Sequence, residues 1–213
     1  SVVLMNTGFA ARQLAEVAAR EGVTDLVYDD EFASVVTDLP PEVRRYRAWV
    51  DGDGDDPTLD EIIAANSTED LPTPKKPGSL VMLTSGTTGV PKGAPRPVRS
   101  PLAPARVLDR VPLRPGELTV LAAPVFHGTG LSQLLMTMSL GSAAAMRRRF
   151  DAEATLAMVE KYSATALVVV PTMLQHILDL GPEAIARYDC SSLRIILTAG
   201  SALPPELGNR ETE

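Results

Sequence analysis

One short segment combines glycines, hydroxyl residues and a lysine. It reads TSGTTGVPKG over residues 84–93 and directly follows an apolar run at 80–83. Glycines allow a backbone to approach a ligand closely, backbone N–H groups can surround an anion, and a lysine ammonium adds a point charge. This composition indicates a phosphate-binding loop, although an exposed turn of small residues would share it. The candidate residues are Thr84, Ser85, Gly86, Thr87, Thr88, Gly89 and Lys92.

The spacing within this segment excludes the Walker A loop. That loop requires a glycine directly before the lysine and a Ser or Thr after it, whereas here Pro91 precedes Lys92 and Gly93 follows it. The G-x-G-x-x-G pattern is also absent. Five prolines between residues 91 and 104 prevent a regular helix before about residue 105, so the segment lacks the helix N-terminus on which P-loop proteins bind phosphate. We therefore expect neither a P-loop hydrolase nor a dinucleotide-binding domain.

Two other segments carry candidate site residues. His127 lies in APVFHGTG (123–130), at the expected end of a strand, where open α/β sheets bind their ligands. Gly200, Ser201 and Ala202 follow the apolar run at 193–199. On composition alone, His127 reads as a structural histidine and the other three residues read as a tight turn.

Composition and charge exclude several classes of protein. The 213 residues are 45% apolar and 22% charged, which is typical of a globular chain with a sizeable core. The net charge of −7 argues against a nucleic-acid partner. A single cysteine, Cys190, rules out an intramolecular disulfide and a cysteine-rich metal site. No apolar run reaches the roughly 18 residues of a transmembrane helix, and no signal peptide is visible. We expect a cytoplasmic protein, at most peripherally associated with a membrane.

Alternating apolar patterns predict an α/β fold with a mostly parallel sheet flanked by helices. Residues 1–50 are predicted to form a βα segment, residues 51–77 an acidic and proline-rich connector with a short helix at 59–65, and residues 78–213 a second α/β region. The predicted strands are 1–6, 24–30, 117–126, 142–150, 165–170 and 193–200, and the predicted helices are 9–20, 128–140, 151–163 and 171–180.

The acidic start of the connector matches a calcium-binding loop only in part. Asp51, Asp53 and Asp55 alternate as in such a loop. The loop also needs Gly at its sixth position and Glu at its twelfth, and these positions hold Asp56 and Ile62. The pattern favours a solvated connector.

The segment at 84–93 closely resembles the phosphate-binding signature of the adenylate-forming enzymes, which include acyl-CoA synthetases, luciferases and nonribosomal adenylation domains. Their pattern [ST]-[SG]-G-[ST]-[ST]-G-x-P-K-G is matched throughout. Residues 123–130 resemble the family's P-x-F-H-x-x-G segment near the acyl pocket, and residues 196–207 resemble the strand and turn beside the adenine. Residues 6–32 are most similar to the fatty acyl-CoA synthetase branch.

This resemblance implies a two-step reaction in the large N-terminal domain of such an enzyme. The carboxylate of a fatty acid, or of a related acid, attacks the α-phosphate of ATP and yields an acyl adenylate and pyrophosphate. The thiol of coenzyme A then displaces AMP. The resemblance assigns Lys92 and its loop to the phosphates, where they stabilise charge on the departing pyrophosphate. It assigns His127 to the acyl pocket, and Gly200, Ser201 and Ala202 to the adenine. Residues 78–213 would thus be the ATP- and acyl-binding region.

Several features of the family do not occur in the sequence. These are the Y-G-x-T-E segment, whose glutamate helps to hold Mg²⁺, the ribose-binding aspartate motif, and the C-terminal domain with its lysine. We therefore expect a truncated N-terminal domain that does not complete the reaction alone and that self-associates through exposed sheet edges. Two alternatives stay open: a fatty acyl-AMP ligase that loads a carrier protein, and a non-catalytic remnant or interaction module that keeps only the fold.

Overall fold

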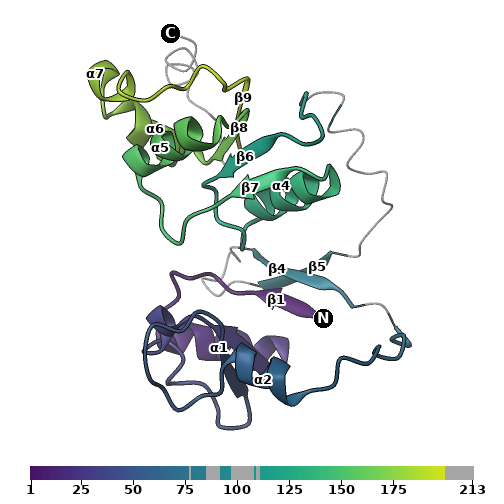
Figure 1. The fold of residues 1–213 in the computed structure, drawn as a ribbon. Coiled ribbons are helices and arrows are strands. Elements are labelled where there is room, and N and C mark those ends of the chain that lie inside the picture. Colours follow the sequence, from purple (N-terminus) through teal and green to yellow (C-terminus); the bar gives the residue numbers. More distant parts are fainter. Residues whose placement is uncertain (77, 85–91, 97–107, 109–110, 200–213) are drawn as a thin grey trace. The chain divides into compact units, whose positions relative to one another are not determined.

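The computed structural model describes the chain except for residues 77, 85–91, 97–107, 109–110 and 200–213 (Figure 1). Contacts divide the chain into two units, Ser1–Val98 and Arg99–Glu213. The strands pair in parallel except for one antiparallel pair, which confirms the predicted α/β class. No helix in the described part of the chain is long and apolar enough to cross a membrane.

The first unit contains two small sheets. One has the order β1-β4-β5, in which β4 (Leu80–Thr84) lies between β1 (Val2–Leu4), its parallel neighbour, and β5 (Lys92–Arg96), its antiparallel neighbour. The other pairs β2 (Asp25–Tyr28) with β3 (Arg44–Arg47) in parallel. The unit's helical elements are α1 (Ala11–Glu21), a 3₁₀ turn at Asp30–Phe32, and α2 (Leu59–Ala65).

An apolar core joins α1 to the rest of this unit. Its buried members are Phe9, Leu14, Val17, Ala18, Leu26, Val36, Leu39 and Val43, and Leu83 of β4 packs against them. The helix ends where the sequence predicts it, because Gly22 adopts a left-handed conformation at φ 64°. The central strand β4 is thereby tied to the core of the unit.

A buried arginine organises the carboxyl ends of β2 and β3. The Arg47 side chain donates hydrogen bonds to the backbone oxygens of Gly52 (2.9 Å) and Asp56 (3.0 Å), and lies 3.3 Å from an Asp30 carboxylate oxygen. Asp30 in turn accepts a hydrogen bond from the backbone N–H of Asp51. These contacts hold residues 51–56, the acidic start of the predicted connector, against the strands.

The second unit is built on one parallel sheet of order β7-β6-β8-β9. Its strands are β6 (Leu118–Leu121), β7 (Ala143–Ala145), β8 (Ala166–Val169) and β9 (Ile195–Thr198). Its helices are α4 (Gly128–Ser139), α5 (Ala152–Tyr162), α6 (Pro171–Leu178) and α7 (Pro182–Ile185). Every residue of β8 is buried, as expected for a strand covered on both faces.

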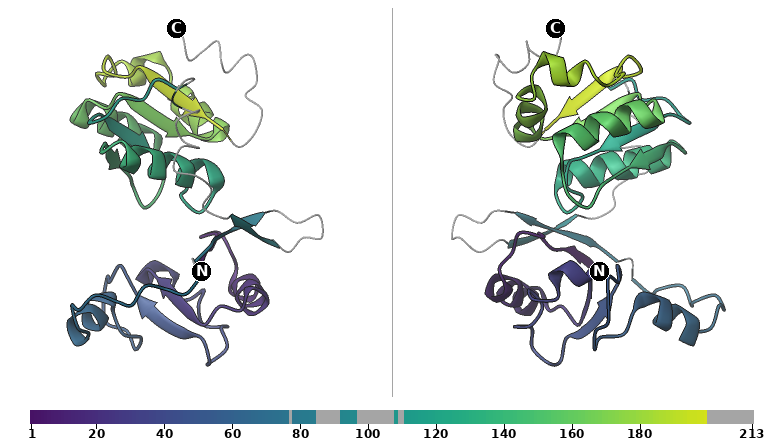
Figure 2. Two further views of the ribbon diagram at one scale, coloured as in Figure 1. Left: turned by 90° about the vertical axis from the view of Figure 1, so that its right-hand side faces the viewer. Right: turned by 60° about the vertical axis from the view of Figure 1, so that its left-hand side comes forward.

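Helices cover both faces of this sheet (Figure 2). Leu134 of α4 packs with Leu121, Ala123 and Val168. The larger cluster on the other face brings α5 and α6 onto the sheet through Val120, Leu156, Val159, Leu167, Val169, Leu174 and Ile177. The connection after β6 therefore runs over one face, and the connection after β8 over the other. This change defines a topological switch point between the carboxyl ends of β6 and β8.

Local signals predicted some boundaries well and others poorly. The connector helix and the Asp151 N-cap are confirmed: α2 spans Leu59–Ala65, and the Asp151 carboxylate accepts a hydrogen bond of 2.7 Å from the backbone N–H of Ala154. The strand predicted at 142–150 is only three residues long. The helix predicted to stop at Gly181 ends at Leu178, because Gly181 instead forms the N-cap of α7.

An ion pair ties together the amino ends of three strands in the second unit. Glu117, directly before β6, accepts hydrogen bonds from the Thr165 hydroxyl (2.9 Å) and from the Arg194 guanidinium. Burial alone would raise the pKa of Glu117, but the hydrogen bonds from Thr165 and Arg194 outweigh it and hold the pKa below its ordinary value of 4.5.

This lowered pKa predicts a pH-dependent contribution to stability. The carboxylate stabilises the fold above about pH 4.5, where it is ionised in both states, and the contribution is lost as the pH falls through the lower pKa of the folded state. We expect Glu117→Gln to lower the free energy of unfolding at pH 7, and the difference from the unsubstituted chain to shrink toward pH 3. Urea unfolding at both pH values measures this, and an unchanged difference would contradict it.

Candidate functional site

The glycine- and hydroxyl-rich segment connects two paired strands. Thr84, the last residue of β4, is directly opposite Lys92, the first residue of β5, so their Cα atoms are only about 5 Å apart. The segment therefore leaves and re-enters the sheet at one point, at the carboxyl end of a central strand. The predicted site residues between these strands, which are Ser85, Gly86, Thr87, Thr88 and Gly89, lie outside the described residues.

His127 lies in the second unit, at the junction between β6 and α4. It is the N-cap residue of α4. Its backbone N–H donates to the Pro124 oxygen (3.2 Å), and its own carbonyl accepts from the N–H of Leu131 (3.0 Å). The imidazole is exposed, with its centroid 4.5 Å from the Phe126 ring. The backbone of His127 is thus fixed on both sides while its ring stays accessible.

Gly130 makes this junction possible. A Cβ atom at this position would lie 2.2 Å from the Pro124 carbonyl oxygen and 2.7 Å from that of Ala123. Both neighbours are backbone atoms, so no side-chain rotation could relieve the clash. Gly130 belongs to the P-x-F-H-x-x-G segment, but this steric role does not follow from the motif. A sequence signal for this role does exist: Gly130 lies within the first turn of the predicted helix, although glycine is a poor helix former.

Three helices begin at the carboxyl edge of this sheet, and they differ in capping. Asp151 caps α5, the helix that follows the edge strand β7. Among the described residues, no side chain caps α4 or α6, which follow β6 and β8 and have His127 and Val170 as their N-cap residues. The first N–H groups of an uncapped helix are free to bind water or a ligand, and the positive end of the helix dipole favours an anion. Both uncapped helices flank the switch point, where α/β sheets bind ligands.

Two further interpretations of the sequence concern the adenine and a calcium ion. Gly200, Ser201 and Ala202 lie outside the described residues, although β9 leads toward them along the edge of β8. Among the residues that the structure describes, no group of three or more His, Cys, Asp or Glu side chains is placed to hold a metal ion. This includes Asp51, Asp53 and Asp55, so the calcium-loop interpretation gains no support.

These features define an α/β protein with a glycine-rich segment after a central strand of its first unit and, in its second unit, a topological switch point of the kind at which α/β sheets bind ligands. The chain matches the model of the family described as AMP-binding enzyme over residues 1–212. It therefore belongs to this family of adenylate-forming enzymes, whose members include acid–thiol ligases that use ATP, Mg²⁺ and coenzyme A.

Three relatives illustrate the match. The chain is 31% identical to a feruloyl-CoA synthase of Amycolatopsis sp over 98% of its length, and 27% identical to the fatty acid–[acyl-carrier-protein] ligase ScoC of Streptomyces coeruleorubidus over 97%. Its fold resembles the N-terminal domain of FACL13 from Mycobacterium tuberculosis with a TM-score of 0.79 over 98% of the chain, at 24% identity. The chain spans 40% of each of the first two proteins and 52% of the third.

Proposed function

We propose that this chain is the ATP- and acid-binding part of a fatty acid–CoA ligase. The observation that carries the proposal is the direct pairing of Thr84 with Lys92. This pairing anchors both ends of the signature segment at the end of one central strand. A short segment rich in glycine and held in this way can direct several backbone N–H groups toward one anion.

In this proposal the segment binds the β- and γ-phosphates of ATP. Lys92 contributes a fixed positive charge and acts electrostatically, not as a base. Its role is to stabilise the negative charge that gathers on pyrophosphate as the acid carboxylate attacks the α-phosphate. Adenylation is needed because a carboxylate is a poor acyl donor, and AMP is a good leaving group for the subsequent attack by the thiol of coenzyme A.

The acid is proposed to bind at the switch point in the second unit. His127 presents an exposed ring at the start of an uncapped helix, which suits a contact with the reacting end of the acid. Gly200, Ser201 and Ala202 are proposed to contact the adenine, since they follow β9 in the same sheet. A fatty acid is favoured by the likeness of residues 6–32 to fatty acyl-CoA synthetases, and by the fatty acid named for ScoC.

A carrier-protein ligase is the second candidate. ScoC, which matches nearly the whole chain, is named as a ligase that transfers its acid to an acyl carrier protein. Both candidates share the adenylation step, and they differ only in the thiol that accepts the acyl group. A whole protein containing this chain would separate them when offered coenzyme A and a phosphopantetheinylated carrier protein in turn.

Calorimetric titration of the chain with MgATP tests the shared step. We expect saturable binding to one site per chain, weakened by competing pyrophosphate, since both ligands would use the same segment. GTP serves as the control for recognition of the adenine. Absence of ATP and pyrophosphate binding by the folded chain would overturn the proposal and favour a remnant that keeps only the fold.

A further inference from the structure

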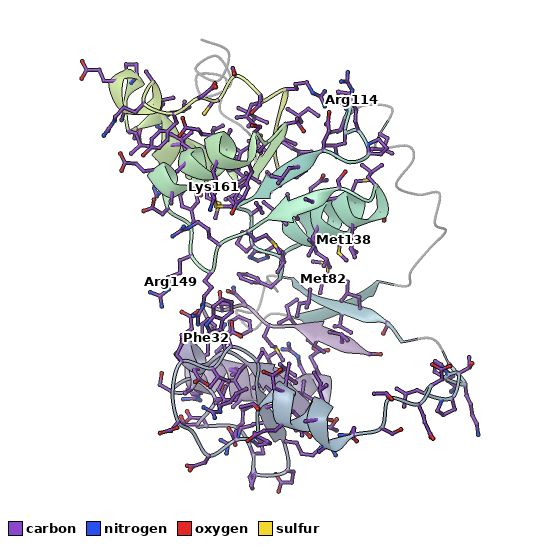
Figure 3. The ribbon with its side chains drawn as sticks, viewed as in Figure 1. Phe32, Met82, Arg114, Met138, Arg149 and Lys161 are labelled. Carbon is purple, nitrogen blue, oxygen red and sulfur yellow. The ribbon has the colours of Figure 1, made fainter. Side chains whose placement is uncertain are left out.

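Helix α2 has an apolar face that stays largely uncovered among the described residues. Leu59, Ile62 and Ile63 recur at the i, i+3 and i+4 spacing that places side chains on one side of a helix. A surface helix normally buries such a face against the core. Helix α2 instead lies at the surface of the first unit without a single buried residue, and Ile63 is 70% exposed (Figure 3).

Local contacts hold α2 in helical form without such packing. Thr58 and Glu61 form a capping box, in which the Thr58 hydroxyl accepts a hydrogen bond from the N–H of Glu61 (3.1 Å) and the Glu61 carboxylate accepts one from the N–H of Thr58 (2.7 Å). The chain just before this box is fixed to β3, because the N–H of Arg47 donates to the Pro57 oxygen (2.9 Å). A helix of seven residues is marginal on its own, so these contacts preform α2 while its apolar face stays open.

The segment that contains α2 also carries the whole excess of negative charge. Residues 51–70, the acidic segment, include eight acidic residues and no basic one, whereas the rest of the first unit has eight acidic and nine basic residues and the second unit has eleven of each. The neighbouring arginines of β3 do not offset this charge, because Arg45 is paired with Asp56 (3.2 Å) and Arg47 with Asp30 (3.3 Å). An open apolar face within such a segment is complementary to a partner that is both basic and amphipathic.

We propose that the acidic segment is a docking site for a basic amphipathic helix of a partner protein. The apolar side chains of that helix cover the face of α2, and its lysines and arginines meet the exposed carboxylates of Asp53, Asp55 and Asp60. This inference does not depend on the proposed function, because none of these residues belongs to the proposed ATP or acid sites. A membrane fits the same face less well, because anionic lipid repels the carboxylates.

Two synthetic helical peptides test the inference by titration of the chain. Both contain only leucine and lysine in equal numbers, but one has all its leucines on a single face and the other has them distributed around the helix. Trp49 is the only tryptophan of the chain, and its indole N–H donates to the Asp51 carboxylate (3.0 Å), so its fluorescence reports on binding to this segment. We expect the amphipathic peptide to bind about tenfold or more tightly than its isomer, and to bind less tightly as salt is added.

Replacing Ile63 by serine separates the apolar contact from the charge. We expect Ile63→Ser to weaken binding of the amphipathic peptide about tenfold, as the loss of one buried isoleucine allows. The melting temperature should not fall, because Ile63 is exposed in the free chain and serine has a similar helix propensity. Leu135→Ser is the matched control, since it removes an exposed apolar side chain from α4 in the second unit, and it should leave the affinity unchanged.

A second pair of variants tests the charge. Asp53→Asn combined with Asp55→Asn should weaken binding of the amphipathic peptide more than Asp38→Asn combined with Glu42→Gln, which removes the same charge from exposed positions before β3. Equal affinities for the two peptides, equal effects of the two charge pairs, or an Ile63→Ser variant that binds like the unsubstituted chain would overturn the inference. Binding to phosphatidylglycerol vesicles but to neither peptide would also overturn it, in favour of a membrane.

Discussion

Replacing Gly130 by alanine is expected to lower the free energy of unfolding by about 3 kcal/mol, at the upper end of what overpacking costs. The added Cβ would meet the Pro124 carbonyl oxygen at 2.2 Å, far inside van der Waals contact. Helix α4 or the end of β6 must therefore move. Because the same turn fixes the backbone of His127, we also expect the proposed acid site to lose its geometry.

Urea unfolding measures this effect, and Ser132→Ala is the control. Ser132 is exposed in the same helix, and its replacement should change the free energy of unfolding by no more than about 0.5 kcal/mol. Alanine is the better helix former at both positions, so helix propensity alone would make both variants more stable. A Gly130→Ala variant as stable as the unsubstituted chain would show that the junction relaxes freely.

Replacing Lys92 by alanine is expected to weaken the binding of ATP and pyrophosphate tenfold to a hundredfold, about 1.5–3 kcal/mol for one charge-assisted contact. Lys92 opens β5 opposite Thr84, so its backbone is held by the sheet whatever its side chain. The fold should therefore tolerate the change. Loss of affinity without loss of melting temperature would separate a role in binding from a role in stability.

Lys75→Ala provides the matched control for this charge. Lys75 is exposed and lies outside the signature segment, so its removal changes the net charge equally while leaving the proposed phosphate site intact. Titration calorimetry of the two variants should show weakened binding for Lys92→Ala alone. An equal loss of affinity in both variants would mean that ATP binding depends only on the overall charge of the chain.

The sequence predicts those elements whose signals are local. The α/β class follows from alternating apolar periods, and the start of α5 follows from the Asp151 cap, which acts within one turn. Strands β3 and β5 could not be predicted in this way. The run Arg44–Arg47 has no apolar alternation, and it forms a strand by pairing with β2 while Arg44 and Arg47 pair with Asp25 and Asp30 from earlier in the chain. Strand β5 contains Pro95, which is tolerated because β5 lies at a sheet edge.

The residues of the candidate site likewise include some that local sequence signals reveal and some that depend on tertiary packing. Lys92 and His127 belong to motifs that can be read directly from the chain, and the structure places them at the start of β5 and at the N-cap of α4. The steric role of Gly130 could not be found from the sequence alone, because it depends on the close approach of the Pro124 and Ala123 carbonyl oxygens. This approach depends on how α4 packs in three dimensions, which no local pattern encodes.

The most direct test of the central claim is to observe the signature segment while it binds its ligand. Nuclear magnetic resonance of the isotope-labelled chain, titrated with pyrophosphate, reports on the backbone amides of Gly86 and Gly89. We predict saturable shifts of both amides with one affinity, no comparable shifts for Gly141 and Gly181 of the second unit, and much weaker shifts in Lys92→Ala. Unchanged Gly86 and Gly89 amides at saturating pyrophosphate would contradict it.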